Sequence, residues 1–164
     1  MILKLATTED FDSFYKLKSD ESNIFWTGWN DKPDYDNLKI FFNNTTIDNV
    51  KEKKDRRIYI AFDNNIAIGY AYIDYVDENM FSLSIGIHSD FHGKGYGKEL
   101  VKLSIQEGLK LGYKNMEAYI REDNIASQKC CEYNGVIKTD KYEIKYIPNL
   151  NKELKMVRYL YESK

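Results

Sequence analysis

The segment of this sequence best suited to bind an anion is glycine-rich and runs His92-Gly93-Lys94-Gly95-Tyr96-Gly97. It lies between a strand-like stretch and a helix-like stretch. Glycines let backbone N–H groups turn toward one point, and the N-terminus of a helix adds partial positive charge. Lys94 could contribute a mobile cation. We therefore predict that this loop cradles phosphate groups.

Two well-known phosphate-binding loops do not fit these residues. A dinucleotide loop needs G-x-G-x-x-G in an opening βαβ unit, whereas the glycines here read G-x-G-x-G after a predicted strand meander. A P-loop needs G-x-x-x-x-G-K-[ST]. Gly97 and Lys98 are present, but Glu99 replaces the hydroxyl residue and His92 replaces the first glycine. Both of these loop types are excluded.

The cysteines and histidines do not form a metal-binding pattern. Cys130 and Cys131 are adjacent, so they make neither a spaced disulfide framework nor a CxxC pair. The two histidines, His88 and His92, do not form an HExxH motif. We predict no metal, and the cysteine usage favours a reducing, cytoplasmic setting.

Composition limits the class of protein. The chain has 164 residues, of which 43% are hydrophobic and 15% aromatic, which excludes disorder as the main state and predicts a single domain over 1–164. The formal net charge of -2 gives no global basic field, so neither nucleic acid nor an anionic membrane is an expected partner. No apolar run is long enough to span a bilayer, and no export signal is visible.

The elements around the loop are predicted from the residue patterns. Three runs rich in Ile, Tyr, Phe and Val, separated by Asn and Asp turns, predict an antiparallel meander over Arg57–Phe62, Ile66–Val76 and Met80–His88. Before the meander we expect a short strand over 1–6, a helix to about Asp20, a loop over 25–29 and a helix carrying Leu38, Phe41 and Phe42. The charge run over 50–57 is predicted to be a solvated connection.

The second half alternates helices and strands. We expect helices over Glu99–Leu111 and Asn124–Asn134, and strands over Met116–Arg121, Val136–Ile147 and Leu154–Tyr161. The passage from Met80 to Arg121 is the one expected parallel crossover. The predicted fold class is α/β (α+β), with one mixed, mostly antiparallel sheet of about seven strands flanked by about four helices.

Two motifs make the chain resemble the GNAT superfamily of N-acetyltransferases. The family's pyrophosphate loop, [QR]-x-x-G-x-[GA], matches His92-x-x-Gly95-x-Gly97 except that His replaces Gln or Arg. The family's later helix, N-x-x-[AS]-x-x-x-Y-x-x-x-G, matches Asn124, Ser127 and Gly135, with Cys131 in place of Tyr. The two motifs occur in the family's order at a suitable separation.

This resemblance implies a transferase that uses acetyl-CoA as cosubstrate. In the family the pantetheine arm pairs with the backbone of the fourth strand, here around Ile85, Gly86 and Ile87, where the fourth and fifth strands diverge. The pyrophosphate would then meet the loop from His92 to Gly97, through Gly93, Lys94, Gly95 and Tyr96. Asn124 and Ser127 would contact the cofactor near the start of the later helix.

The catalytic residues are less well defined. The amine must be neutral when it attacks the thioester, and the leaving thiolate needs a proton or a hydrogen bond. The resemblance gives the second role to Cys131, although a buried apolar role fits this residue equally well. Some members of the family place a carboxylate early on the fourth strand, which here falls near Ser82 and Ser84, where this chain has no acid. Glu117 on the fifth strand is therefore the nearest candidate base. Trp26 and Trp29 are candidates for a wall of the substrate pocket.

The predicted function is N-acetyl transfer from acetyl-CoA to a primary amine, either of a small molecule or of a protein N-terminus, by direct attack in a ternary complex. The acidic overall charge weakly favours a cationic acceptor. Two alternatives stay open: a non-catalytic acyl-CoA-binding or regulatory domain, and a nucleotide-binding module. An exposed edge in the last two predicted strands could pair across a homodimer.

Overall fold

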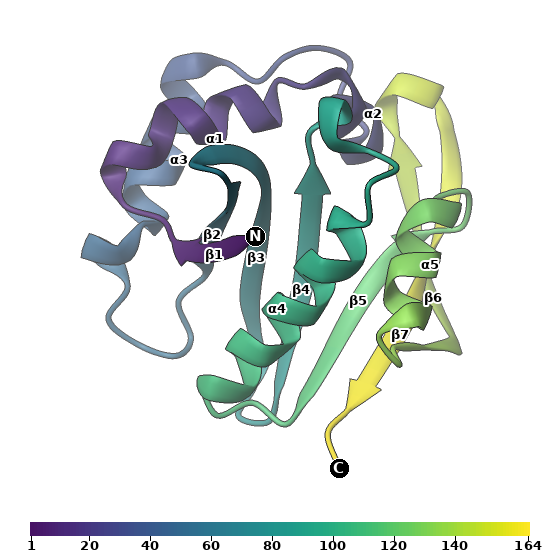
Figure 1. Ribbon diagram of the computed structural model, residues 1–164. Coiled ribbons are helices and arrows are strands. Elements are labelled where there is room, and N and C mark those ends of the chain that lie inside the picture. Colours follow the sequence, from purple (N-terminus) through teal and green to yellow (C-terminus); the bar gives the residue numbers. More distant parts are fainter.

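A computed structural model describes residues 1–164, and its centre is one seven-stranded sheet (Figure 1). The strand order is β1-β2-β3-β4-β5-β7-β6, and only the β4–β5 pair is parallel. The strands are β1 (Ile2–Leu5), β2 (Arg57–Asp63), β3 (Ile66–Asp77), β4 (Met80–Ile87), β5 (Asn115–Arg121), β6 (Ile137–Ile147) and β7 (Lys152–Glu162). The helices are α1 (Phe11–Lys18), α2 (Glu21–Thr27), α3 (Tyr35–Thr45), α4 (Tyr96–Lys110) and α5 (Ile125–Tyr133).

The predicted meander is confirmed. Asn64 and Asn65 adopt left-handed backbone angles, with φ of 49° and 64°, in the turn that joins β2 to β3. Asn tolerates this conformation better than most residues, so the Asn residues predicted a turn at this place. The three strands then pair in order, β2 with β3 and β3 with β4.

The parallel pair β4–β5 is short. It holds for three residue pairs, Met80 with Asn115, Phe81 with Met116 and Ser82 with Glu117. Beyond these pairs β4 continues beside β3 as far as Ile87, and β5 continues beside β7 as far as Arg121. The two strands therefore separate toward their carboxyl ends, as Figure 1 shows for β4 and β5.

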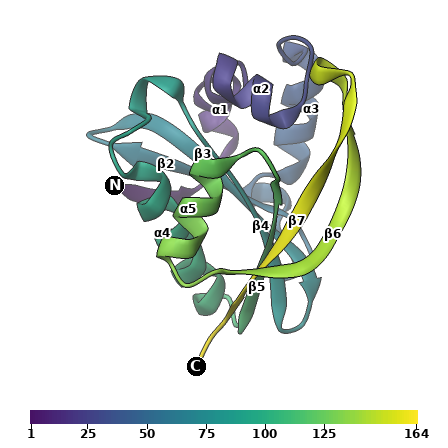
Figure 2. The same cartoon turned by 90° about the vertical axis from the view of Figure 1, so that its right-hand side faces the viewer.

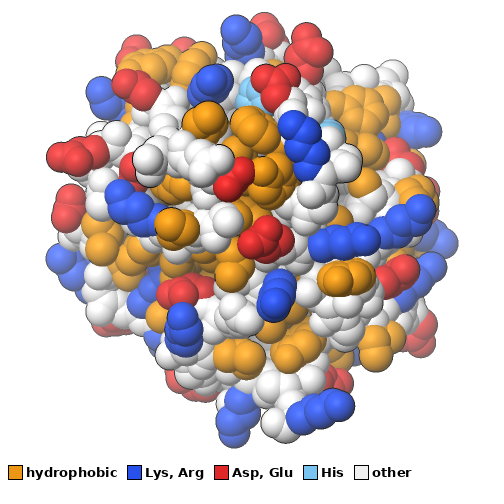
Figure 3. Space-filling view, viewed as in Figure 1, with side chains coloured by type: hydrophobic (Ala, Val, Ile, Leu, Met, Phe, Trp, Pro, Cys, Tyr) orange, Lys and Arg blue, Asp and Glu red, His pale blue; other side chains and the backbone are white.

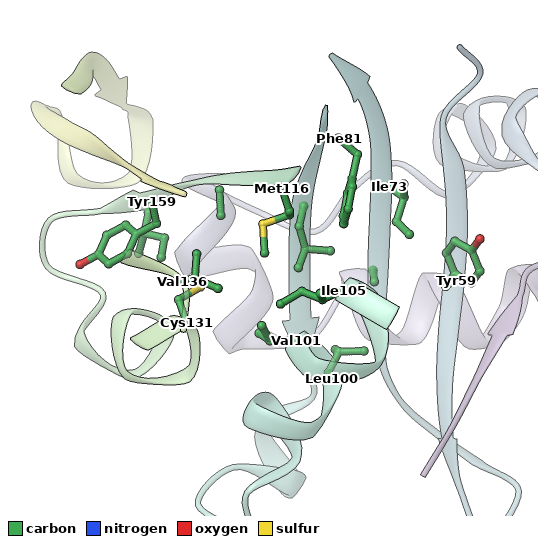
Figure 4. Packing of buried hydrophobic residues seen from close by; sticks show 14 of the residues in the cluster. Tyr59, Ile73, Phe81, Leu100, Val101, Ile105, Met116, Cys131, Val136 and Tyr159 are labelled. Atoms are coloured by element: carbon green, nitrogen blue, oxygen red, sulfur yellow. The ribbon is translucent and has the colours of Figure 1, made fainter. Parts of the chain in front are cut away.

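Helices cover both faces of the sheet. One buried cluster of 17 residues packs beneath α4 and α5 and includes Phe81, Leu100, Val101, Met116 and Cys131 (Figure 4). A second cluster of 8 residues joins α1 and α3 to the other face through Phe14, Phe42 and Tyr70. Figure 2 shows α4 and α5 on one side of the sheet and α2 and α3 on the other. The core is thus split into two layers by the strands.

The structure corrects three expectations about the helices. The helix predicted to run to about Asp20 ends at Lys18, and Asp20 instead caps a separate α2. The loop expected over 25–29 is helical as far as Thr27 and ends at Gly28, whose φ is +88°. Five α-helices are present where about four were expected. The adjacent aromatic residues Phe25 and Trp26 contact each other and the guanidinium of Arg121, and neither belongs to a core cluster, so α2 shows no apolar period.

The later elements agree with the sequence within a few residues. The helix expected from Glu99 begins at Tyr96, so the last two residues of the glycine-rich segment form its first turn. The helix expected over Asn124–Asn134 spans Ile125–Tyr133 with Asn124 as its N-cap. Strands β5, β6 and β7 lie where the sequence predicted them.

Charges of both signs are scattered among apolar side chains on the face that carries α4 (Figure 3). None of the helices combines the length and the apolar character needed to cross a membrane.

Close packing of α4 on β4 generates a stability prediction. A Cβ at Gly108 would clash with the ring of Phe81, which is fully buried. Ala is normally favoured over Gly within a helix. We nevertheless expect Gly108→Ala to lower the free energy of unfolding by about 1–3 kcal/mol, because the ring must move in a dense core. Urea denaturation measures this change. The exposed Gln106→Ala in the same helix should be nearly neutral, and an equal loss in both variants would contradict the packing argument.

Candidate active site

The separation of β4 and β5 opens a cavity of about 310 Å³ that is lined by 20 residues. Leu83, Ser84 and Ile85 line it from β4, and residues 118–121 line it from β5. Past Ser82 the side of β4 that faces β5 has no strand partner. Its outward N–H and C=O groups are therefore free to pair with an extended ligand.

The cavity reaches both faces of the sheet. Val101 and Cys131 line it from the layer beneath α4 and α5. Tyr70 lines it from the layer that contacts α1 and α3. A ligand that enters along α4 and α5 can thus meet, within the opening between the strands, a second ligand that enters from the side of α1 and α2.

The glycine-rich loop ends directly at the N-terminus of α4. Gly95 is the N-cap residue, with φ of 84°, and Gly93 has φ of 76°. No atom lies within 4 Å of a Cβ built on either glycine, and no side chain caps the helix. The first N–H groups of α4 have no intrahelical acceptor. The loop and helix therefore present backbone donors and a positive dipole end to an open space, as an anion site requires.

The side chains of the loop are directed elsewhere. Nε2 of His92 lies 2.9 Å from the carbonyl oxygen of Ile87 and ties the loop to the end of β4. The hydroxyl of Tyr96 donates to the carboxylate of Asp63, and this hydrogen bond raises the pKa of Tyr96. The ammonium of Lys94 lies 5.6 Å from the ring centroid of Phe91. The groups that the loop leaves available to an anion are therefore those of its backbone.

Gly97 has a packing role that the sequence did not reveal. A Cβ at this position would lie 2.8 Å from Sγ of Cys130 in α5. Gly97 thus lets the first turn of α4 approach α5 closely. This approach brings the N-terminus of α4 near α5, on which the second sequence motif lies.

Asn124 and Ser127 both line the cavity. Oδ1 of Asn124 accepts a hydrogen bond of 3.2 Å from the backbone N–H of Ser127 and so caps α5. Capping and ligand contact are compatible, because a cap residue lies at the end of the helix where an anion is favoured. Because Asn124 and Ser127 both line the cavity, the N-terminus of α5 forms part of the cavity wall.

Cys131 also lines the cavity, but it is 3% exposed and belongs to the larger core cluster, near Val136 and Tyr159 in Figure 4. Burial raises the pKa of its thiol to about 12. Since ordinary thiols have a pKa of about 8.5, transfer of a proton from this group to a departing thiolate would be unfavourable. The geometry favours Cys131 as a small apolar wall residue over Cys131 as an acid.

Glu117 is not brought to the cavity. It lies in the paired part of β5, opposite Ser82, and its Oε2 is 2.7 Å from Nε of Arg158. This ion pair satisfies the carboxylate within the sheet. No Asp or Glu is among the residues that line the cavity. Glu117 is therefore not the base that we propose for this site.

The two tryptophans differ in whether they line the cavity. Trp26 lines the cavity from α2. Trp29 lies beyond the end of α2 and is not part of the lining, but its ring centroid is 4.9 Å from Nζ of Lys18, which does line the cavity. Only Trp26 therefore forms part of the wall directly.

Lys18 is the functional candidate that sequence reasoning missed. Its side chain is 4% exposed, lines the cavity, and donates a 3.0 Å hydrogen bond to the hydroxyl of Tyr70. Burial, followed by the nearby charge of Arg56, lowers the pKa of Lys18 to about 8. Its position seven residues after Phe11 and four after Phe14 was the available signal, because a lysine on the apolar face of a helix is unusual.

Arg56 corrects the interpretation of the charge run over 50–57. It lines the cavity, and its guanidinium forms a bidentate ion pair with Asp74, with distances of 2.6 and 2.9 Å. In the rest of that run Lys51, Glu52 and Lys54 are exposed, as expected, and the other residues are half-buried.

A buried carboxylate fixes α2 against the end of β4. Asp20 accepts hydrogen bonds from the backbone N–H and the hydroxyl of Ser89, at 3.2 and 2.6 Å, and lies 3.4 Å from His88. It also caps α2 through the N–H of Asn23. One side chain thus holds the helix that carries Trp26 beside the strand whose edge is free.

Comparison with solved structures shows the same fold in several acetyltransferases. The spermidine N-acetyltransferase from Vibrio cholerae, in complex with CoA and spermine, is 14% identical with a TM-score of 0.83, covering 99% of this chain and 95% of that chain. The ribosomal-protein-alanine N-acetyltransferase from Brucella melitensis is 17% identical with a TM-score of 0.79, covering 99% of both chains. An acetyltransferase structure from Salmonella typhimurium that holds its cofactor acetyl-CoA is 17% identical with a TM-score of 0.77, covering 99% and 94%.

A family model for the acetyltransferase (GNAT) domain matches residues 1–137. This range includes β4, the glycine-rich loop, the cavity-lining residues of β5 and both motif helices. The chain therefore belongs to the GNAT acetyltransferase family.

Proposed function

We propose that this protein is an N-acetyltransferase that transfers the acetyl group of acetyl-CoA to a primary amine of a small molecule or of a protein N-terminus. The observation that carries the proposal is the cavity that passes between β4 and β5, beside the unpaired edge of β4 and the open N-terminus of α4. Donor and acceptor can approach this opening from opposite faces of the sheet.

The donor would bind mainly through backbone groups. The free edge of β4 at Ile85, Gly86 and Ile87 supplies pairing positions for the pantetheine amides. The loop from His92 to Gly97 supplies N–H donors for the pyrophosphate. Asn124 and Ser127 close the cavity from α5. The Salmonella typhimurium structure, which holds acetyl-CoA in the same fold, supports this assignment.

The reaction would be a direct transfer in a ternary complex. The neutral amine nitrogen attacks the thioester carbonyl carbon, a C–N bond forms, the C–S bond breaks, and the electron pair leaves on sulfur. The amine loses one proton and coenzyme A gains one, so the products are the N-acetyl amine and free coenzyme A. Because no carboxylate lines the cavity, the acceptor loses its proton to solvent rather than to a side-chain base.

A second candidate function is non-catalytic binding of acyl-CoA. It is favoured by the same lack of a carboxylate and by the raised pKa of Cys131. Turnover of any amine in the presence of acetyl-CoA separates the two functions.

Two further expectations stay predictions. Cys130 and Cys131 are both free thiols, which fits the reducing cytoplasmic setting. The edge strand β6 carries exposed Tyr142, Ile144 and Tyr146, so a homodimer formed through this edge is still expected. Sedimentation measures the oligomeric state.

The first test of the proposed function is calorimetric titration with acetyl-CoA and free coenzyme A, with ADP and NAD as controls. We expect both coenzyme forms to bind and both controls to bind clearly more weakly, since only coenzyme A has an arm that can pair with β4. Failure of a folded sample to bind either coenzyme form would contradict the assignment. Equal binding of ADP and coenzyme A would indicate a nucleotide site instead.

The backbone nature of the anion site leads to a matched pair of variants. Gly95→Ala should weaken coenzyme A binding about tenfold or more, the value of one hydrogen bond to a charged group. Gly135 is its control, because it also has a positive φ, 76° against 84°, and open space around a built Cβ. Both variants carry backbone strain of about 1–2 kcal/mol. Calorimetry should show weakened binding for Gly95→Ala alone, and equal weakening would show a general loss of structure.

The burial of Cys131 predicts that its thiol is dispensable for chemistry. We expect Cys131→Ala to keep kcat within about threefold, whereas removal of a general acid costs about 100-fold or more. Steady-state kinetics with a turned-over amine measures this. A loss of 100-fold in a variant that still binds acetyl-CoA normally would restore Cys131 as the acid.

A further inference from the structure

The cavity is lined by cations and by no anion. Four of its 20 residues are Lys or Arg, and none is Asp or Glu. Two of these cations form ion pairs with carboxylates that lie outside the lining: Arg56 pairs with Asp74, and Arg121 pairs with Asp123. Lys18 and Lys145 have no ion-pair partner. The cavity is therefore positive although the whole chain is slightly acidic.

Lys18 is the more unusual of the two unpaired cations, because it is buried. An ammonium group has three N–H donors, and the only hydrogen bond that Lys18 makes is to Tyr70. The rings of Trp29, Tyr70 and Tyr72 surround it, with centroids 4.9, 4.6 and 5.6 Å away. Aromatic rings recover part of the lost hydration energy, but a buried cation without a counter-ion remains costly.

A second charge lies on the same aromatic surface. Cζ of Arg56 is 4.6 Å from the ring centroid of Tyr72, and the second cation near this ring is Lys18. Two cations thus lie near the ring of Tyr72. The carboxylate of Asp74 forms an ion pair with Arg56 and not with Lys18. This part of the cavity is formed by α1, β3 and the segment before β2, and not by the coenzyme loop. The positive charge therefore faces the space left for the acceptor.

Resting on the proposed function, we propose that the acceptor is a primary amine that also carries an anionic group, such as an amino acid, and that the Lys18 ammonium binds this anion beside Arg56. The carboxylate would accept the hydrogen bonds that Lys18 has free. The amine at the other end of the acceptor would then lie between β4 and β5, where the thioester carbon is placed. A polyamine, with a second ammonium in place of the carboxylate, would be repelled.

This inference departs from two simpler expectations. The overall charge of the chain weakly favours a cationic acceptor, and one solved structure of the same fold binds spermine. Charges within the cavity have the stronger influence, because they are close to the ligand and little screened by solvent. A likeness of fold at 14% identity does not carry the acceptor site with it.

The test compares acceptors that differ only in the charge at one end. Glycine, β-alanine and γ-aminobutyrate are each matched with the diamine and the amino alcohol of the same length, and an aminoalkylphosphonate distinguishes a carboxylate site from a phosphonate site. We expect kcat/KM to fall from acid to alcohol to diamine, by about tenfold or more between the acid and the diamine. Preference for the diamines would overturn the inference while leaving acetyl transfer established.

Variants then assign the preference to Lys18. Lys18→Met keeps the length and apolar stem but removes the charge, so we expect KM for the acids to rise about tenfold or more while the affinity for acetyl-CoA is unchanged. Lys18→Arg should restore part of the preference. Lys39→Met is the control, because Lys39 also contacts aromatic rings, those of Phe11 and Tyr35, but is exposed and outside the cavity. An unchanged acid preference in Lys18→Met would overturn the assignment.

A binding measurement separates this inference from the proposed function. Calorimetric titration of the acids into the protein alone, and into its mixture with free coenzyme A, needs no turnover. Acids that bind the unaltered protein and not Lys18→Met would support the anion site even if no acetyl transfer occurred. Absence of acid binding under both conditions would overturn it, whatever the result with acetyl-CoA.

Discussion

The separation of β4 from β5 after three parallel pairs is the constraint on which the rest of the structure depends. It leaves one edge of β4 without a partner in the middle of a sheet, where unpaired backbone groups would normally be costly. It also opens the sheet, so that side chains from both layers line one cavity. A transfer reaction needs two ligands to meet, and an opening through a sheet gives each ligand a separate approach. On either side of the opening, β4 is paired with β3 and β5 is paired with β7 along the full lengths of β4 and β5.

The two approaches are built from different materials. On the side of α4 and α5 the groups available to a ligand are backbone donors, placed by two left-handed glycines and by the first turn of a helix. A backbone site tolerates the replacement of side chains, and His92 accordingly holds the loop to β4 instead of facing the ligand. On the side of α1 and α2 the groups that line the cavity are side chains, because Lys18, Trp26 and Tyr72 provide charge and aromatic surface. Donor recognition can therefore remain constant in this fold while acceptor recognition changes with a few residues.

Buried charge connects stability with function in this molecule. Asp20 is buried with enough donors to satisfy it, and it fastens α2 to the end of β4. The Glu117–Arg158 pair is likewise satisfied within the sheet. Lys18 differs from both, because burial lowers its pKa to about 8 and no carboxylate of the chain neutralises it. A group that remains costly in the free protein can become favourable when a ligand supplies the missing anion.

The sequence by itself determined the order of elements and the glycine loop on which the proposed coenzyme site rests, because these depend on local properties: alternation of apolar residues, Asn turns, glycine angles and helix caps. It also determined the family, since both motifs lie in short segments. It could not determine which side chains face the cavity, because the acceptor side is assembled from α1, α2, β3, β5, β6 and β7. Glu117 and Cys131 have suitable chemistry in the sequence, but the fold gives one an arginine partner and encloses the other in the core. Arg56 was expected to be a solvated charge, and Lys18 was not singled out. Only tertiary packing placed them together, because burial and distance depend on contacts between residues far apart in the chain.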